Sequence, residues 1–232
     1  SQTNTLPIKF NASIPKAINH TLNVPSAQVK TSLIFSALSS PNNSIIKDTF
    51  NTRDHTERLI QFLGYNKSYF TKFPIKGFNY TIPGDISSAS FLIGAALLIP
   101  GSNIIIKDLI FNERRCGYIN ALQRMGANID IKNQSIYQNE PICDLRVKYT
   151  DRLKSTNISH KNIVSIIDEI PIFALVCAHA FGTSKIEGAK ELRHKESDRI
   201  YSIVYNFKKL NINIKEIDDG FIIKGPNRLY NT

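Results

Sequence analysis

Several short segments of the chain combine polar and charged residues in patterns that could bind an anion or move a proton. The first is Ser26–Lys30, in which a serine precedes a run of helix-forming residues. Because a helix N-terminus has free backbone N–H groups, the Ser26 hydroxyl and the amides after it could hold a phosphate, with Gln28 as a neutral donor. The alternative is that Ser26 is an ordinary N-cap, which needs no ligand.

The second segment, Arg53–Arg58, lies between an expected strand and an expected helix. The Arg53 guanidinium could bind a carboxylate or a phosphate through two parallel hydrogen bonds. Asp54, followed three residues later by Glu57, also matches a capping box that would only stabilise the start of a helix. Both interpretations can hold together, and His55 is interpreted as structural rather than catalytic.

The third segment, Gly84–Ser90, has the pattern of a capped helix start. It follows Gly77–Pro83, where the composition changes and where we expect a hinge or a domain boundary. This position favours a scaffold role for the segment over a catalytic role.

The fourth candidate combines Asp168, which precedes an apolar run, with the charged stretch Glu191–Arg199. Lys195, Glu196 and Arg199 are predicted to bring an acid and two cations within one helical turn. That grouping suits proton transfer beside an anionic substrate. The alternative is a solvated, salt-bridged helix start, and composition alone favours it.

These segments recur at corresponding places in three copies of one pattern. Each copy has an opening residue, an apolar helical run, a short strand, and a second helix followed by an alternating strand. The number of residues from Ser26 to Gly64 equals that from Ser88 to Gly126, whereas the copy opened by Asp168 is longer. One unit cannot bury both its helices and its sheet, so the units must pack together. The sequence therefore predicts an α/β fold of repeated units.

The composition indicates a folded protein with an anionic partner. The chain has 232 residues, of which 42% are hydrophobic, and this is enough for one large domain or two modest ones. It has 29 lysine and arginine residues against 19 acidic residues, a net charge of +10 that favours anions. Richness in Ile, Asn and Lys leaves codon bias open as a source of part of this charge. The basic residues form no long run, which argues against a nucleic-acid arm.

Cysteine spacing and the lengths of the apolar stretches indicate the cellular compartment. The three cysteines are widely spaced, so neither a disulfide framework nor a zinc site is predicted. The longest apolar stretch, Phe91–Pro100, is about half as long as a bilayer span requires. No charged and then apolar leader opens the chain. We therefore expect a cytoplasmic protein that has no membrane contact.

Five motifs of the chain, taken together, resemble those of the 5-enolpyruvylshikimate-3-phosphate synthase family, the 3-phosphoshikimate 1-carboxyvinyltransferases. One such motif is weak evidence, whereas five in the family's order are specific. The resemblance covers essentially the whole chain, although the family is nearly twice as long. The motifs are Ser26–Lys30, Arg53–Glu57, Gly84–Ala89, Asp168–Pro171 and Lys195–Arg199.

The resemblance implies a fold of two lobes, each built from three βαβαββ units, with the active site in the cleft between them. Residues 1–82 would form part of one lobe, as one such unit with a preceding strand. Residues 83–232 would form part of the second lobe, as two units. The chain would then be an incomplete copy of this inside-out barrel of the enolpyruvyl transferases.

The resemblance also implies a reaction. The enolpyruvyl group of phosphoenolpyruvate would pass to the 5-hydroxyl of shikimate 3-phosphate, with release of phosphate, on the route to chorismate and the aromatic amino acids. The hydroxyl would add to C2 as C3 takes a proton, and the adduct would then eliminate phosphate. No metal or other cofactor is implied, and the implied partners are these two small anions, without nucleic acid.

The same resemblance assigns roles to matching residues. Asp168 would contact the shikimate hydroxyls and act as a catalytic base, and Glu196 would move protons. Arg199 would bind phosphoenolpyruvate, and Gln28 would lie near both substrates. The residues implied in substrate binding are Ser26, Ala27, Gln28, Arg53, Asp168, Lys195 and Arg199.

Some family motifs are missing from the chain, among them an N-terminal segment with a catalytic lysine and a later Gly-Asp-His-Arg motif. We therefore expect the chain alone to be inactive or nearly so, unless a complementary chain supplies these parts. Three alternatives stay open: a relative that acts on UDP-N-acetylglucosamine, a catalytically inactive fragment or half of a split enzyme, and a nucleic-acid-binding module. The Arg53–Glu57 and Lys195–Arg199 motifs favour shikimate 3-phosphate. A nucleic-acid module would need a basic stripe with exposed aromatic residues, which we do not find.

Overall fold

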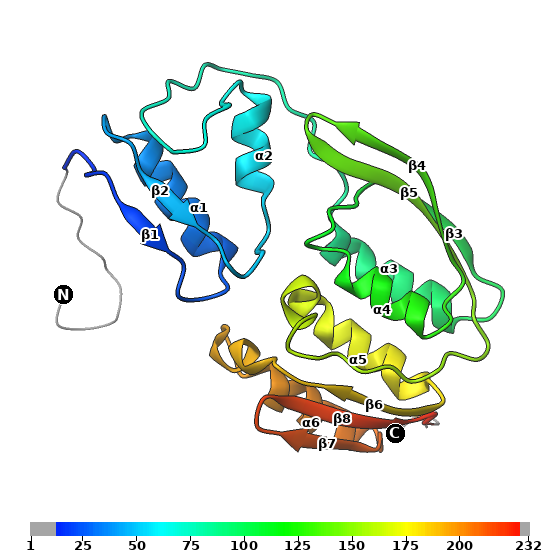
Figure 1. The fold of residues 1–232 in the computed structure, drawn as a ribbon. Helices are drawn as coiled ribbons and strands as arrows, with labels where there is room; N and C mark the ends of the chain where they lie inside the picture. Colours follow the sequence, from blue (N-terminus) through cyan, green and yellow to red (C-terminus); the bar gives the residue numbers. More distant parts are fainter. Residues whose placement is uncertain (1–12, 228–232) are drawn as a thin grey trace. The chain divides into compact units, whose positions relative to one another are not determined.

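The computed structural model describes residues 13–227 of the chain, which divide into two compact units (Figure 1). Unit 1 contains Ile60–Phe78 and the described residues up to Thr52. Unit 2 contains Arg53–Leu59 and the described residues from Asn79 onwards. Helix α2 (His55–Phe62) thus begins in unit 2 and ends in unit 1. The division into two lobes at residue 82 stays a prediction.

Unit 1 is built on a parallel pair of short strands, β1 (Asn19–Thr21) and β2 (Ile45–Lys47). A parallel pair needs a crossover connection, and α1 (Ala27–Leu38) supplies it. The helix begins where the sequence predicts, because the Ser26 hydroxyl accepts a hydrogen bond from the Val29 amide at 3.3 Å. A small core consists of Ile34, Leu38, Ile60 and Tyr65, with Ile46, Phe70 and Phe73 packed against it.

Unit 2 contains two antiparallel sheets, and each sheet has its last strand in the centre. The first sheet has the order β3 (Asn103–Ile110), β5 (Glu140–Lys148) and β4 (Ile129–Tyr137). The second has the order β6 (Gly182–Ile186), β8 (Gly220–Gly225) and β7 (Ile214–Ile217). The two sheets are therefore copies of one arrangement.

Each sheet of unit 2 is joined to a pair of α-helices and follows the same chain order of helix, strand, helix, strand, strand (Figure 1). Single parallel bridges also precede each first helix, from Gly84 to Leu109 and from Ile158 to Ile186. These bridges occupy the place of the leading strand in a βαβαββ unit. The predicted α/β fold of repeated units is confirmed, with two complete units in unit 2. The strand expected after the second helix of the first copy is wrong, because no strand follows α2 in the described residues 63–85. The helices are α3 (Ile86–Leu98), α4 (Gly117–Arg124), α5 (Ile170–His179) and α6 (Arg199–Lys209), and the 3₁₀ turns are η1 (Ile163–Ser165), η2 (Ile167–Glu169) and η3 (Lys190–His194).

The predicted capped helix start within Gly84–Ser90 is confirmed, whereas Ser88 and Asp168, the opening residues of two copies, do not cap their helices. Helix α3 is opened by Asp85, whose carboxylate accepts a hydrogen bond from the Ser88 amide at 2.8 Å, so Ser88 lies inside the helix. Aspartate and serine are both favourable N-cap residues, and in α3 the aspartate, three residues before the serine, is the N-cap. Asp168 lies in the 3₁₀ turn η2 rather than at the N-cap of α5, which begins at Ile170.

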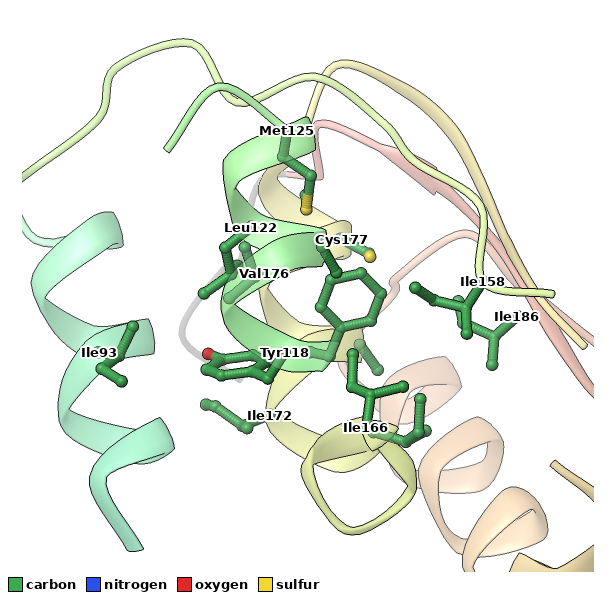
Figure 2. Close-up of a cluster of buried hydrophobic side chains, with 14 of the residues drawn as sticks. Ile93, Tyr118, Leu122, Met125, Ile158, Ile166, Ile172, Val176, Cys177 and Ile186 are labelled. Carbon is green, nitrogen blue, oxygen red and sulfur yellow. The ribbon is translucent and has the colours of Figure 1, made fainter. Parts of the chain in front are cut away.

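The core of unit 2 lies among its helices and sheets. Figure 2 shows Tyr118, Leu122 and Met125 packed with Val176 and Cys177 in this core. The Tyr118 hydroxyl is satisfied, because it donates to the Ser90 carbonyl at 3.2 Å.

The three cysteines are free and buried. Burial raises the pKa of Cys116 and of Cys177 to about 12, so these thiols are protonated and unreactive at neutral pH. Within residues 13–227, no group of three or more His, Cys, Asp or Glu side chains is arranged to hold a metal ion. No helix in this part of the chain is long and apolar enough to span a membrane.

The packing around Leu122 predicts a large effect of truncation. Leu122 is 0% exposed, whereas Ile136 on β4 is 74% exposed. Leu122→Ala leaves a cavity and should lower the free energy of unfolding by about 2–5 kcal/mol. Ile136→Ala should change it by less than about 0.5 kcal/mol. Urea unfolding followed by circular dichroism measures both, and equal losses would contradict the placement of the core.

Candidate functional site

Two candidate residues far apart in the sequence meet in unit 2. Arg53 and Asp168 are separated by 115 positions, and Nη2 of Arg53 donates a hydrogen bond to Oδ2 of Asp168. Arg53 lies two residues before the start of α2, and Asp168 lies in η2. Their side chains are 32% and 27% exposed, so solvent still reaches the pair. The ion pair is therefore accessible to a small ligand.

The electrostatics place two further candidates near Asp168. Burial alone would raise the pKa of Asp168. The hydrogen bond and the charge of Arg53, followed by the charges of Lys195 and Arg199, outweigh burial and lower this pKa below its ordinary value. Asp168 is thus ionised at neutral pH, in contact with Arg53 and within the electrostatic influence of Lys195 and Arg199. The structure brings Arg53, Asp168, Lys195 and Arg199 into one region of unit 2.

The predicted arrangement of Lys195, Glu196 and Arg199 within one helical turn is wrong. Helix α6 begins only at Arg199, because Asp198 is its N-cap and accepts a hydrogen bond from the Tyr201 amide at 2.9 Å. Lys195 and Glu196 lie in the non-helical loop between η3 and α6. The charges reach Asp168 from a loop and a helix start rather than from one helix face.

Both cations of this region form ion pairs with acidic side chains. Nζ of Lys195 lies 2.8 Å from Oε1 of Glu191, and Nη2 of Arg199 lies 2.8 Å from Oε2 of Glu196. Glu196 is 83% exposed, so this ion pair adds little stability and a multiply charged anion could displace its carboxylate. The backbone N–H of Glu196, and then Arg199, lower the pKa of Glu196, so it is a carboxylate at neutral pH.

The remaining candidates belong to unit 1. Ser26 is the N-cap of α1, Ala27 is its first residue, and Gln28 is exposed in its first turn. The structural interpretation of Ser26 as a cap is confirmed. A role for these three residues in holding a phosphate stays a prediction, and so does their convergence with the residues of unit 2.

Comparisons with known proteins agree with these motifs. The family model described as EPSP synthase (3-phosphoshikimate 1-carboxyvinyltransferase) matches residues 1–232. This chain belongs to the EPSP synthase family. The resemblance inferred from the five motifs is confirmed.

Individual members of the EPSP synthase family are similar over most of the chain. The 3-phosphoshikimate 1-carboxyvinyltransferase of Endomicrobium trichonymphae is 39% identical over 98% of this chain and 55% of its own length. That of Carboxydothermus hydrogenoformans is 42% identical over 89% of this chain and 50% of its own length. The solved EPSP synthase of Acinetobacter baumannii matches with a TM-score of 0.82 and 33% identity, over 92% of this chain and 49% of that one. The chain therefore spans about half the length of its curated relatives.

A more distant structure supports the fold alone. The enolpyruvyl transferase NikO from Streptomyces tendae matches with a TM-score of 0.62 at 12% identity.

The family motif Ser26–Lys30 contains a structural residue that sequence reasoning passed over. Lys30 is 2% exposed, and its Nζ lies 3.0 Å from Oδ2 of Asp48 and 3.3 Å from the Thr52 carbonyl. Asp48 also accepts hydrogen bonds from the amide and the hydroxyl of Thr52. Lys30 thus ties α1 to the chain just ahead of Arg53.

The family motif Arg53–Glu57 is held by side chains from elsewhere in unit 2. Oδ1 of Asp54 accepts from Nδ2 of Asn112 at 2.6 Å and from Nε of Arg58 at 3.0 Å. Asp54 therefore joins two segments, while its role in a capping box stays a prediction. Because Asn112 lies far along the sequence, spacing gives no sign of it.

His55 has a structural partner, as its interpretation from the sequence requires. Its Nδ1 lies 2.7 Å from Oε1 of Glu140, whose side chain is 4% exposed at the start of β5. Next to Glu140, Asn139 donates from Nδ2 to the Arg58 carbonyl at 3.0 Å. The tip of the β4–β5 hairpin thus contacts the first turn of α2 through these two side chains and holds it in place. Sequence reasoning missed Glu140, because a strand residue in a hairpin carries no motif.

Arg193 is a second anchor that the sequence did not single out. Its guanidinium lies 2.9 Å from a carboxylate oxygen of Asp198 and 2.9 Å from one of Glu216, and it donates to the Ile217 carbonyl at 2.9 Å. It thus joins the N-cap of α6 to β7. This anchor fixes the loop that carries Lys195 and Glu196.

We predict that Arg53→Ala raises the pKa of Asp168, because the burial that opposes ionisation remains while its main partner is lost. In the native chain, ionised Asp168 stabilises the fold above its unfolded pKa, and this contribution is lost as the pH falls through the lower folded pKa. Carboxyl ¹³C NMR titration measures the change. Arg152→Ala, which removes the same charge at an exposed position, should leave the Asp168 midpoint in place. An unchanged midpoint in Arg53→Ala would refute the pairing.

His55→Ala should destabilise unit 2, because it leaves the buried Glu140 carboxylate without this partner. We expect a loss of about 1–3 kcal/mol in the free energy of unfolding. The matched control is His160→Ala, which breaks a 3.1 Å pair with Asp219 in which the histidine is 74% exposed. That control should cost less than about 1 kcal/mol. Urea unfolding tests both variants, and an equal or smaller cost for His55→Ala would show that the His55–Glu140 contact is not structural.

Proposed function

We propose that this chain carries part of the site that transfers the enolpyruvyl group of phosphoenolpyruvate to the 5-hydroxyl of shikimate 3-phosphate. The observation that carries the proposal is the gathering of Arg53, Lys195 and Arg199 around the ionised Asp168. Membership of the EPSP synthase family supports it. The proposed partners are the two small anions and a complementary chain that supplies the segments matching the rest of the family's length.

The cations offset the electrostatic repulsion between the two anionic substrates. Both substrates carry several negative charges, so their approach is opposed by Coulomb repulsion, which weakens only where positive charge is fixed nearby. Lys195 would bind shikimate 3-phosphate, Arg199 would bind phosphoenolpyruvate, and Arg53 would line the acceptor pocket. In this proposal Ser26, Ala27 and Gln28 add the neutral donors of a helix start to the acceptor phosphate.

The acids supply the proton transfers. Asp168 is ionised and partly exposed, so it can accept the proton of the 5-hydroxyl as the oxygen adds to C2. Glu196 would give a proton to C3 and take one back when the adduct loses phosphate. The exposed carboxylate of Glu196 is paired with Arg199. Engagement of Arg199 by phosphoenolpyruvate would remove that partner and favour protonation of Glu196.

The wider organisation follows the family. We propose that residues 1–82 and 83–232 belong to two lobes and that the protein is cytoplasmic. We also propose that the isolated chain turns over little or no substrate, since it spans about half the length of its relatives.

Binding and turnover test the proposed function separately. Isothermal titration calorimetry should show shikimate 3-phosphate binding to the chain. Arg53→Ala and Lys195→Ala should each weaken it about tenfold or more, because each removes a charged hydrogen bond. Arg152→Ala should not weaken it, and UDP-N-acetylglucosamine should not bind. Equal losses in all three variants, or preference for the sugar nucleotide, would refute the assignment of the acceptor.

Phosphate release from the two substrates measures turnover. We expect the isolated chain to be nearly inactive, and activity should appear when a polypeptide with the remaining family segments is added. Robust turnover by the isolated chain would contradict the expected inactivity while supporting the reaction. Binding without turnover in the mixture would contradict the reaction.

A further inference from the structure

A buried polar network lies directly beside Asp168. Glu169, the next residue of η2, is 3% exposed, and its Oε1 accepts a hydrogen bond from Ser87 Oγ at 2.5 Å. The same hydroxyl accepts from Nη2 of Arg115 at 2.6 Å, and Arg115 donates to Oδ1 of Asp85 at 3.0 Å. Because Ser87 both donates and accepts, the hydroxyl joins a buried carboxylate to a buried guanidinium.

The network connects the starts of three helices. Ser87 and Asp85 open α3, Arg115 precedes α4, and Glu169 is the N-cap residue of α5. Helices α3 and α5 pack closely nearby, since a Cβ added at Gly94 would lie 3.0 Å from the Ile172 side chain. Close packing leaves η2 little freedom to turn without breaking the hydrogen bond to Ser87.

The charges hold Glu169 in one place. Burial raises the pKa of Glu169, while the hydrogen bond from Ser87 and the charge of Arg115 act in the opposite direction. An acidic side chain at 3% exposure has few alternative positions in which its oxygens are satisfied. Loss of the Ser87 hydroxyl would therefore release the Glu169 side chain from its anchor.

Asp168 and Glu169 are consecutive residues of a single 3₁₀ turn. Fixing the side chain of one therefore fixes the direction in which the other leaves the turn. In the structure the Glu169 carboxylate is anchored to Ser87, and the Asp168 carboxylate meets Arg53.

We propose that Ser87, Arg115 and Glu169 are positioning residues, which lock η2 so that the Asp168 carboxylate faces Arg53 and the site around it. The assignment of that site to substrate rests on the proposed function, whereas the locking of the Asp168–Arg53 pair does not. This gives the segment Gly84–Ser90 a role in the site, although the segment itself need not touch a ligand.

The first test reads the Arg53–Asp168 pair in the free chain. NMR measures the rotation rate of the Arg53 guanidinium, which is slow while the group is held, and the carboxyl shift of Asp168. Ser87→Ala should speed the rotation about tenfold and move the Asp168 signal. Ser87→Thr keeps a hydroxyl and should restore both. The matched control is Ser184→Ala, since Ser184 is 1% exposed and its Oγ accepts from the Thr156 amide at 3.2 Å.

A second variant keeps the test decisive if Ser87→Ala does not fold. Glu169→Asp retains the charge but withdraws the carboxylate from Ser87, so it should also speed the Arg53 rotation. Unchanged rotation in Glu169→Asp and in folded Ser87→Ala would overturn the proposal. So would an equal effect of Ser184→Ala, because the network would then act only through general stability.

Calorimetry with shikimate 3-phosphate separates this inference from the proposed function. Ser87→Ala should weaken binding about tenfold and Ser87→Thr should restore it, while Ser184→Ala should leave it unchanged. If the native chain does not bind shikimate 3-phosphate, the proposed function fails, and the NMR comparison alone still decides whether the network positions Asp168.

Discussion

The ion pair of Arg53 and Asp168 is the interaction on which the candidate site depends. It joins two segments 115 residues apart and brings an ionised carboxylate among three cations. Without such partners, burial would raise the pKa of this carboxylate and weaken its preference for the ionised form. The cations without the carboxylate would repel one another. The cations therefore keep the carboxylate ionised, and the carboxylate reduces the repulsion among the cations. The properties of the candidate site follow from this balance rather than from any single residue.

The structure anchors three of the candidate charges through an acidic neighbour in the sequence. Arg53 is followed by Asp54, which is bonded to Asn112. Asp168 is followed by Glu169, which is bonded to Ser87, and Arg199 is preceded by Asp198, which caps α6 and pairs with Arg193. In each pair, one residue faces the site and its neighbour is tied to the protein scaffold. A backbone position fixed in this way restricts where the adjacent side chain can point, which is the condition that electrostatic catalysis requires.

The sequence predicts the repeats and the local signals well, because both depend on neighbouring residues. The α/β units and the Ser26 cap are visible in periodicity and in one short motif. The capped start of α3 was predicted, but spacing could not tell that Asp85 rather than Ser88 is its cap. Asp168 lies in a 3₁₀ turn ahead of α5, which no spacing rule predicts. The meeting of Arg53 with Asp168 was expected only from the family resemblance. Glu140, Asn112 and Arg115 could not be found, since each acts on a partner distant in sequence and chosen by packing.

The acidic partners of Lys195 and Arg199 also explain how a basic chain can gather cations at one place without losing stability. With a net charge of +10, unpaired cations gathered at one place would oppose folding. Lys195 and Arg199 are instead paired with Glu191 and Glu196, whose side chains are 41% and 83% exposed. Exposed pairs contribute little to stability, so exchanging one carboxylate for a phosphate of higher charge costs little. The cations can therefore be neutralised in the free protein and still be available to an anion. Asp168 differs from these carboxylates because its pair with Arg53 is less exposed and its turn is anchored, so it can remain in place while the outer pairs are exchanged.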